Sequence, residues 1–181
     1  MEVLLQKTSM LDYDHPSIQS LIKFKGWESL SEFQKIRDIY NYVRDEILFG
    51  YNIDDSISAS KVLADGYGQC NTKGTLLMAL LRAVGIPCRV HGFTIDKKLQ
   101  KGAMTGIVYY SAPKNVLHSW VEVLYQNHWY ELEAVILDSD YLKKLRKLHP
   151  ECAGAFCGYG VAVSNFQNPV IDWNCNNTYI Q

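Results

Sequence analysis

Cys70 is the residue of this sequence that is best placed to act as a nucleophile. It follows a turn with two glycines, Gly66 and Gly68, and it precedes a helical pattern of leucines that stops at Gly85. The pattern predicts a helix over Thr72–Val84 with the cysteine at its amino terminus. Unpaired backbone N–H groups and the positive end of the helix dipole stabilise a thiolate there, and the thiolate is the reactive form of cysteine.

The same position would serve the next step of an attack on a carbonyl. The glycines would let a substrate approach the backbone closely, and the N–H of Cys70 would be a donor for the oxyanion that forms. The alternative is that Cys70 is a small buried residue, the commonest fate of a free cysteine. That alternative suits the other cysteines better, because they lack paired spacing: Cys88, Cys152, Cys157 and Cys175. We therefore expect free thiols and no structural zinc site.

A cysteine nucleophile needs a histidine to take its proton and a third group to orient that histidine. The segments Leu117–Tyr125 and Trp129–Ile136 are predicted to be the two strands of a hairpin. If Gln126 and Asn127 form a two-residue turn, Glu133 becomes a diagonal neighbour of His118 on the same face. The sequence therefore predicts a base and an acid that can meet.

Other arrangements remain open in this part of the sequence. A four-residue turn preserves the alternation of faces, whereas a three-residue turn without a bulge would put Glu133 on the opposite face. Glu131 shares the face of Glu133 and is the rival acid, although it lies nearer the turn. His91, on the strand predicted over Cys88–Ile95, is the reserve base.

The elements that must position these residues are helices before the cysteine and strands after it. Apolar residues at helical spacing predict helices over about Pro16–Gly26 and Ser31–Ile47, followed by a loop over Phe49–Ser60. The segment Asp96–Asn115 contains glycines and a proline, and we predict that it is an excursion near the mouth of the site. Leucines at helical spacing predict another helix near residues 142–148. No secondary structure is predicted for the tail beyond that helix.

The composition excludes several classes of protein. Of 181 residues, 48% are hydrophobic and 20% are charged, and the formal net charge is −1. This is the balance of an ordinary globular domain, without the basic excess of a nucleic-acid-binding protein. The start of the chain, Met1–Leu11, has no basic stretch followed by a long apolar run, so we expect neither a secretory signal nor a membrane anchor. We expect a cytoplasmic protein.

Three blocks of the sequence resemble the transglutaminase-like superfamily of papain-type cysteine enzymes. They read G-Y-G-Q-C-N-T-K-G-T-L-L-M-A-L-L-R-A-V-G-I-P-C-R-V-H-G-F, then H-S-W-V-E-V, then W-Y-E-L-E, and they cover Tyr51 to about Asp138. The resemblance implies that Cys70 is the nucleophile, His118 the base and Glu133 the acid. The family usually has aspartate at the position of Glu133, and glycine is common in the turn where this chain has a histidine.

The resemblance also implies an α+β fold with a papain-like core, in which the nucleophile helix packs on an antiparallel β-sheet behind N-terminal helices. We expect one transglutaminase-like domain over 1–181, with a helical part at 1–48, a core at about 49–138 and a C-terminal extension at 139–181. The expected reaction is hydrolysis of an amide bond in a peptide, protein or small amide through a thioester on Cys70. The alternatives are an acyl or amide transferase and a catalytically inactive peptide-binding module.

Four further residues are candidates for the oxyanion hole or the cleft: Gln69, Tyr67, Tyr51 and Trp120. The first three carry side chains that could donate a second hydrogen bond to the oxyanion, and each of them has an equally good structural interpretation. Trp120 would cover the base and limit water, although a packed core indole is as good an interpretation. No metal, cofactor, nucleic acid or membrane is expected to take part.

Overall fold

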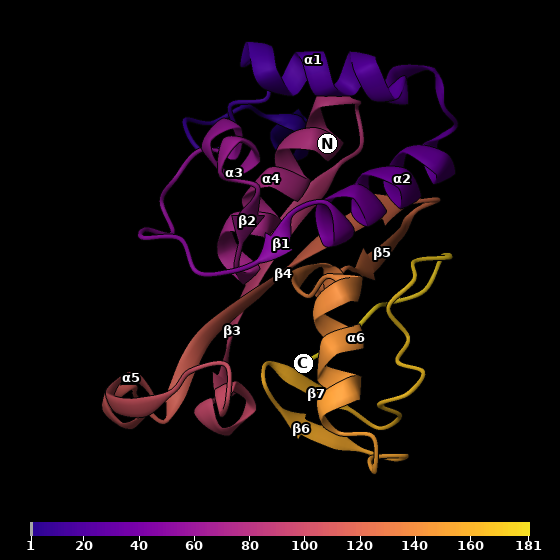
Figure 1. Ribbon diagram of the computed structural model, residues 1–181. Coiled ribbons are helices and arrows are strands. Elements are labelled where there is room, and N and C mark those ends of the chain that lie inside the picture. The colour runs from indigo at the N-terminus through magenta and orange to yellow at the C-terminus, as the bar shows by residue number, and fades with distance from the viewer. Residues whose placement is uncertain (1) are drawn as a thin grey trace.

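The computed structural model describes residues 2–181, except for the side chain of Val108, and combines helices with strands (Figure 1). The α-helices are α1 (Pro16–Lys25), α2 (Glu32–Asp45), α3 (Ala59–Asp65), α4 (Cys70–Ala83), α5 (Gly106–Ser111) and α6 (Ser139–Leu148). The strands are β1 (Leu48–Phe49), β2 (Tyr67–Gly68), β3 (Cys88–Asp96), β4 (Asn115–Tyr125), β5 (His128–Glu131), β6 (Phe156–Gly158) and β7 (Val161–Val163). Short 3₁₀ helices are η1 (Glu2–Leu5), η2 (Trp27–Ser29), η3 (Lys97–Gln100) and η4 (Glu133–Ile136).

The two long N-terminal helices form where the sequence supplies their end signals. Gly26 ends α1 in the left-handed conformation, with φ 67°. Ser31 starts α2 with a capping box, because its side chain accepts from the N–H of Gln34 while the Gln34 side chain accepts from the N–H of Ser31. The apolar face of α2, which includes Ile36 and Ile39, lies in the main hydrophobic core. Both predicted helices are present.

Helix α4 lies at the centre of this core and is buried on nearly all sides. Its residues from Thr72 to Leu81 are buried, and it packs against β4, α2 and α3 (Figure 1). Gly74 faces the sheet, where a Cβ would make an ordinary van der Waals contact of 3.5 Å with a methyl carbon of Val121. The predicted packing of this helix on an antiparallel sheet is confirmed. The burial fixes the position of Cys70, the first residue of the helix, relative to that sheet.

The sheet that supports α4 has the order β3-β4-β5, and both pairs are antiparallel. The hairpin between β4 and β5 has a two-residue turn, one of the turn lengths that the sequence left open, with Tyr125 paired to His128. Gln126 and Asn127 both have positive φ, 49° and 62°, as a type I′ turn requires. This turn fixes the register of the two strands. A separate two-stranded pair, β1-β2, is parallel and lies just before α4.

The second strand of the hairpin is shorter than the sequence predicts. The prediction of a strand over Trp129–Ile136 is wrong in its second half, because β5 ends at Glu131 and the 3₁₀ helix η4 follows. The reason is a competing partner from the C-terminal part of the chain. Leu132 forms a parallel bridge with Thr178, and the N–H of Glu133 donates to the carbonyl of Thr178 at 3.1 Å.

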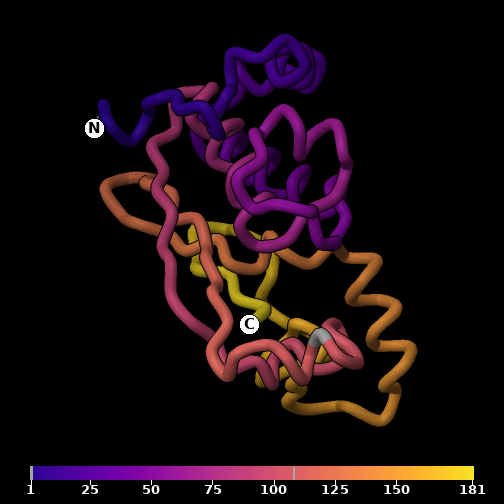
Figure 2. Tube along the Cα trace, turned by 90° about the vertical axis from the view of Figure 1, so that its left-hand side faces the viewer, coloured from indigo at the N-terminus to yellow at the C-terminus, as the bar shows by residue number. Residues whose placement is uncertain are grey.

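Two hydrophobic clusters divide the buried side chains. The larger one joins α1, α2, α3, α4 and the β3-β4-β5 sheet. The smaller one joins η4, α6, β7 and residues of the C-terminal tail, and Phe49 and Cys70 pack against its edge. Figure 2 shows the C-terminal end near the middle of the molecule. The cysteine therefore lies where the two clusters meet, whereas the division into three parts at 48 and 138 stays a prediction.

Some elements of the structure were not predicted from the sequence. Helix α3 begins where the predicted loop ends, and the hairpin β6-β7 lies in the tail that had no prediction. The predicted helix near residues 142–148 is present as α6.

Within residues 2–181, every helix is too short or too polar to cross a lipid bilayer.

Candidate active site

The turn before Cys70 is shaped by its glycines, but not for the reason that the sequence suggested. Gly66 ends α3 with φ 70°, and Gly68 lies against the start of α4. A Cβ at Gly68 would lie 2.6 Å from the hydroxyl of Thr72, which is closer than a side-chain carbon can approach. The expectation that these glycines admit a substrate is therefore not met at Gly68. The missing side chain instead lets the chain turn tightly against the nucleophile helix.

Cys70 is the first residue of α4 and is partly exposed. Its thiol lies 3.8 Å from the side-chain oxygen of Asn71. Gln69 is the N-cap residue, and its N–H donates to the hydroxyl of Thr72 at 3.0 Å. The first turn of α4 thus places the sulfur at the positive end of the helix dipole, where a thiolate is favoured.

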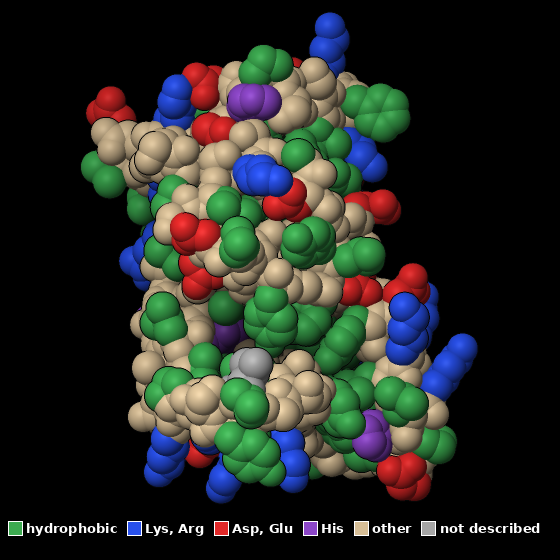
Figure 3. Space-filling model, turned by 60° about the vertical axis from the view of Figure 1, so that its left-hand side comes forward, with side chains coloured by type: hydrophobic (Ala, Val, Ile, Leu, Met, Phe, Trp, Pro, Cys, Tyr) green, Lys and Arg blue, Asp and Glu red, His purple; other side chains and the backbone are tan. Residues whose placement is uncertain are grey.

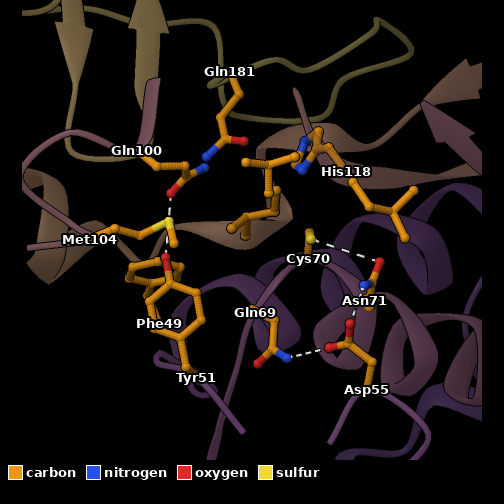
Figure 4. A pocket seen from close by; sticks show the side chains of 13 residues that line it. Phe49, Tyr51, Asp55, Gln69, Cys70, Asn71, Gln100, Met104, His118 and Gln181 are labelled. Carbon is orange, nitrogen blue, oxygen red and sulfur yellow. Dashed lines mark hydrogen bonds between the residues drawn. The ribbon is translucent and has the colours of Figure 1, made fainter. Parts of the chain in front are cut away.

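His118 lies on β4 and faces the same cavity as Cys70 (Figure 4). Its side chain is only 2% exposed, and Nε2 lies 2.9 Å from Oε1 of Glu133. The ring of Phe93, its cross-strand neighbour, packs against the imidazole at 5.0 Å in an edge-to-face arrangement. Because Nε2 is engaged by the carboxylate, Nδ1 is the nitrogen left to exchange a proton with the cysteine.

Glu133 begins η4 and is 1% exposed. Its second oxygen, Oε2, accepts hydrogen bonds from the backbone N–H groups of Ile180 and Gln181, the latter at 3.0 Å. The structure brings Glu133 and His118 together, as the sequence predicts, but by a different route. The acid reaches the imidazole from a 3₁₀ helix beyond the end of β5, and not from a strand position opposite β4.

The surroundings of His118 change its pKa in opposing ways. Burial lowers the pKa, because it disfavours the charged imidazolium. Hydrogen bonds and charge interactions with Cys70 and Glu133 outweigh burial and raise the pKa from 6.5 to about 9. The imidazolium form therefore dominates at neutral pH, which is the protonation state that stabilises a neighbouring thiolate.

Lys73 is fully buried one turn into α4. Its Nζ donates to three backbone carbonyl groups, those of Arg44 at 3.0 Å, Ile47 at 2.7 Å and Ile136 at 3.0 Å. Burial lowers the pKa of Lys73 from 10.5 to about 7. The three carbonyl groups belong to the end of α2, the residues before β1 and the end of η4. This side chain therefore joins the helix that carries the cysteine to the segment that carries the acid.

A cavity of about 180 Å³ opens beside Cys70 and His118 (Figure 4). In Figure 3 the surface is hollowed across its middle, and hydrophobic side chains gather around the hollow. Of the predicted cleft residues, Gln69 and Tyr51 line the cavity. The Gln69 amide donates one hydrogen bond to Asp55, and the Tyr51 hydroxyl lies 3.3 Å from the Gln100 side-chain oxygen. The Tyr51 hydroxyl would have to exchange this partner before it could bind an oxyanion, whereas the Gln69 amide has a second N–H.

The other two predicted cleft residues lie outside the lining of the cavity. The ring of Tyr67 covers Gly50, where a Cβ would meet it at 3.0 Å. Trp120 packs on Phe93 at 4.3 Å and stacks on His91 at 4.8 Å. The indole therefore supports the ring that contacts His118 and does not cover the imidazole itself.

The alternative base and acid are engaged elsewhere. His91 is half-exposed, and its Nδ1 lies 3.3 Å from the carboxylate of Glu122. Glu131 accepts a hydrogen bond from the hydroxyl of Tyr179. Neither lies beside Cys70, so the structure favours His118 and Glu133 as the partners of the cysteine.

The sequence reasoning missed several residues of the cavity: Asp55, Asn71, Gln100, Met104 and Gln181. Asn71 was detectable in principle, because the residue after a nucleophile at a helix start must lie beside it. Gln100 and Met104 lie in the excursion between β3 and β4, which does border the site as predicted. Nothing in the sequence links Gln181 to this cavity, since only the path of the tail brings it there.

A carboxylate that orients an imidazole, which in turn activates a neighbouring thiol, is a known arrangement for a nucleophilic cysteine. A protein-family comparison matches residues 25–134, more than half of the chain, to the Transglutaminase-like superfamily. Among solved structures the fold is similar to that of a candidate cysteine protease from Cytophaga hutchinsonii, with a TM-score of 0.57 and 19% sequence identity. That match covers 76% of this chain and 42% of the other. No curated protein matches the chain. With its core matched over residues that include Cys70, His118 and Glu133, the chain belongs to the transglutaminase-like superfamily.

Proposed function

We propose that the protein is a thiol-dependent hydrolase that cleaves an amide bond in a peptide, a protein or a small amide through a thioester on Cys70. The observation that carries this proposal is the hydrogen bond between the buried Glu133 and His118, which lines the same cavity as Cys70. The carboxylate holds the imidazole in one orientation and tautomer, as a catalytic histidine requires. Family membership and the similar fold support a cysteine-dependent enzyme in general.

In the first half of the reaction, the Cys70 thiolate attacks the carbonyl carbon of the substrate. A C–S bond forms and the carbonyl electron pair moves to oxygen, and the N–H of Cys70 stabilises the resulting oxyanion. The His118 imidazolium then gives its proton to the leaving nitrogen as the C–N bond breaks. The products of this half are a free amine, a thioester and a neutral imidazole.

In the second half, the neutral His118 takes a proton from a water molecule as its oxygen attacks the thioester carbonyl. The C–S bond breaks, the carboxylic acid leaves, and the thiolate returns beside an imidazolium. The Glu133 carboxylate stabilises the imidazolium each time it forms. The raised pKa of His118 suits it to the first half, because the proton donor is already in place at neutral pH.

The experiment is mass spectrometry of the intact protein after exposure to a panel of peptide and amide substrates. We expect an acyl adduct that maps to Cys70, is removed by hydroxylamine and disappears in Cys70→Ala. His118→Ala should abolish the adduct as well, whereas His91→Ala should keep it. An adduct on another residue, or one that persists in both variants, would contradict the proposed chemistry.

The same assay separates hydrolysis from the alternatives. Hydrolysis gives the same acid product with or without added primary amines, whereas a transferase gives an acyl amine in their presence. A peptide-binding module without turnover would give no adduct, and its Cys70 would react with iodoacetamide no faster than a free cysteine. Either of these results would replace the hydrolase proposal.

A further inference from the structure

A second cavity lies next to the one that contains the thiol of Cys70. Its volume is about 400 Å³, and it shares three lining residues with the first cavity, namely Asp55, Asn71 and Leu117. The two cavities are therefore neighbours that share part of their lining. A pocket of this volume falls in the range that holds a small ligand or a large side chain.

The apolar wall of the second cavity combines residues from separate parts of the chain. Met10 and Leu11 come from the N-terminal segment, Met78 from α4, and Val90 from β3. The N-terminal segment lies outside residues 25–134, the part of the chain that matches the family model. Val90 is 60% exposed, as an apolar residue on an open wall is before a ligand covers it.

The polar groups of this cavity are already paired within the protein. The hydroxyl of Thr75 donates to the carbonyl of Asn71 at 3.0 Å, and that of Ser119 donates to the Asn71 side-chain oxygen at 2.7 Å. The hydroxyl oxygen of Thr8 accepts from the N–H of Leu11 at 3.0 Å. An occupant would therefore gain little from hydrogen bonding and most from burial of apolar surface.

A fixed polar partition separates the two cavities. The Asn71 amide donates to one carboxylate oxygen of Asp55 at 2.7 Å, and the Gln69 amide donates to the other (Figure 4). These contacts leave the negative charge of Asp55 at the boundary. The residues that line the second cavity include no lysine, arginine or histidine. An acidic side chain in this cavity would meet the like charge of Asp55 without a cation among the lining residues to offset it.

From these features we infer that the second cavity is a specificity subsite for the reaction at Cys70. It takes an apolar side chain on the acyl part of the substrate, next to the carbonyl that the thiolate attacks, and it disfavours an acidic side chain. The inference rests on the proposed function for its meaning, but it can be tested without turnover. Alkylation of Cys70 by a reagent with a side chain reports the subsite directly.

The probes are three acylated aminoacyl chloromethyl ketones that differ only in the side chain of glycine, leucine or aspartate. The Cys70 thiolate attacks the methylene carbon, a C–S bond forms and chloride leaves. Each rate is divided by the rate of labelling with iodoacetamide, which corrects for changes in the thiolate itself. We expect the leucine reagent to react about 10-fold or more faster than the glycine reagent, and the aspartate reagent to be the slowest.

Two substitutions at Val90 test the location of the subsite, because this residue lines only the second cavity. Val90→Asp should reduce the leucine-to-glycine ratio toward one and slow the aspartate reagent further. Val90→Lys should reduce the same ratio and raise the relative rate of the aspartate reagent. The control is Phe24→Asp on α1, which introduces the same charge at a side chain that is 84% exposed and lines neither cavity.

The outcomes separate the subsite from the proposed hydrolase function. Equal corrected rates for the glycine and leucine reagents, or ratios in both Val90 variants that match Phe24→Asp, would overturn the subsite. A clear leucine preference that falls in both Val90 variants supports it, even if no amide is ever hydrolysed. Amide turnover without that preference would retain the hydrolase and reject the subsite.

Discussion

The two ends of the candidate triad are held by opposite kinds of structure. Cys70 is placed by local features, namely a tight turn and the first turn of a helix that is buried along its length. Glu133 is placed by distant ones, because its carboxylate is held by N–H groups 47 and 48 residues later in the chain. Changes in the C-terminal tail should therefore alter the orientation of His118 by way of Glu133, whereas the position of Cys70 should not change.

Removal of the sulfur should give the largest effect on activity. Cys70→Ala eliminates the only atom that can form the thioester, so we expect turnover to fall by about 10⁴-fold or more. The residue is partly exposed and its thiol interacts with the side chains of Asn71 and His118 and not with the backbone of another element, so the fold should be retained. Circular dichroism and a thermal midpoint near that of the wild type would confirm this. Substantial turnover in this variant would disprove nucleophilic catalysis by Cys70.

Glu133→Gln tests the other end with nearly the same shape. An amide can present its N–H to the imidazole and so favour the wrong tautomer, and we expect a rate loss of about 10²- to 10⁴-fold. The pKa of His118 should also fall, because the raising effect of the carboxylate is lost. Glu131→Gln is the matched control, since this acid binds Tyr179 instead. Equal rate losses in the two variants would contradict the role of Glu133 as the residue that orients His118.

The pH dependence should follow the raised pKa of His118. The rate of amine release should fall above about pH 9, where the imidazolium that donates the proton is lost. Because the folded pKa exceeds the ordinary value of 6.5, the stabilising effect of the charged imidazole is complete below that value and is lost as pH rises through about 9. NMR titration of His118 would measure this. A titration near 6.5 in the wild type would contradict the interaction with both partners.

A smaller effect should come from the tail that holds the acid. The hydroxyl of Tyr40 lies 3.2 Å from that of Thr178, which is fully buried. Thr178→Val removes this hydrogen bond while it keeps the side-chain shape and the backbone contacts. The free energy of unfolding should therefore fall by about 1 kcal/mol. Turnover should fall several-fold, but the rate of labelling of Cys70 by iodoacetamide should change less. Tyr179→Phe is the control, because its hydroxyl serves Glu131 and not Glu133.

The features that could be predicted from the sequence are those that neighbouring residues decide. The capping box at Ser31, the helix that starts at Cys70 and the turn at Gln126 and Asn127 all follow from local rules. The 3₁₀ helix at Glu133 does not, because Thr178 supplies the competing hydrogen bonds from the tail.

The same limit explains the missed and misplaced cavity residues. Trp120 is near His118 in the sequence, but the register of β3 places Phe93 opposite the histidine. That register depends on the whole length of the strand pair and is not visible in the residues around the histidine. The alternation of the hairpin and the family resemblance both indicated Glu133 as the acid, whereas only the fold reveals what holds it.

The buried amino group of Lys73 has a consequence for how the molecule opens. Its three acceptor carbonyl groups lie in three separate segments, so none of them can move away without breaking a hydrogen bond in the interior. In hydrogen exchange, the amide protons at the start of α4 and in η4 should therefore show one common protection free energy and one common urea dependence. Fluctuations that separate the sulfur from the carboxylate should be as rare as the cooperative unfolding of both segments.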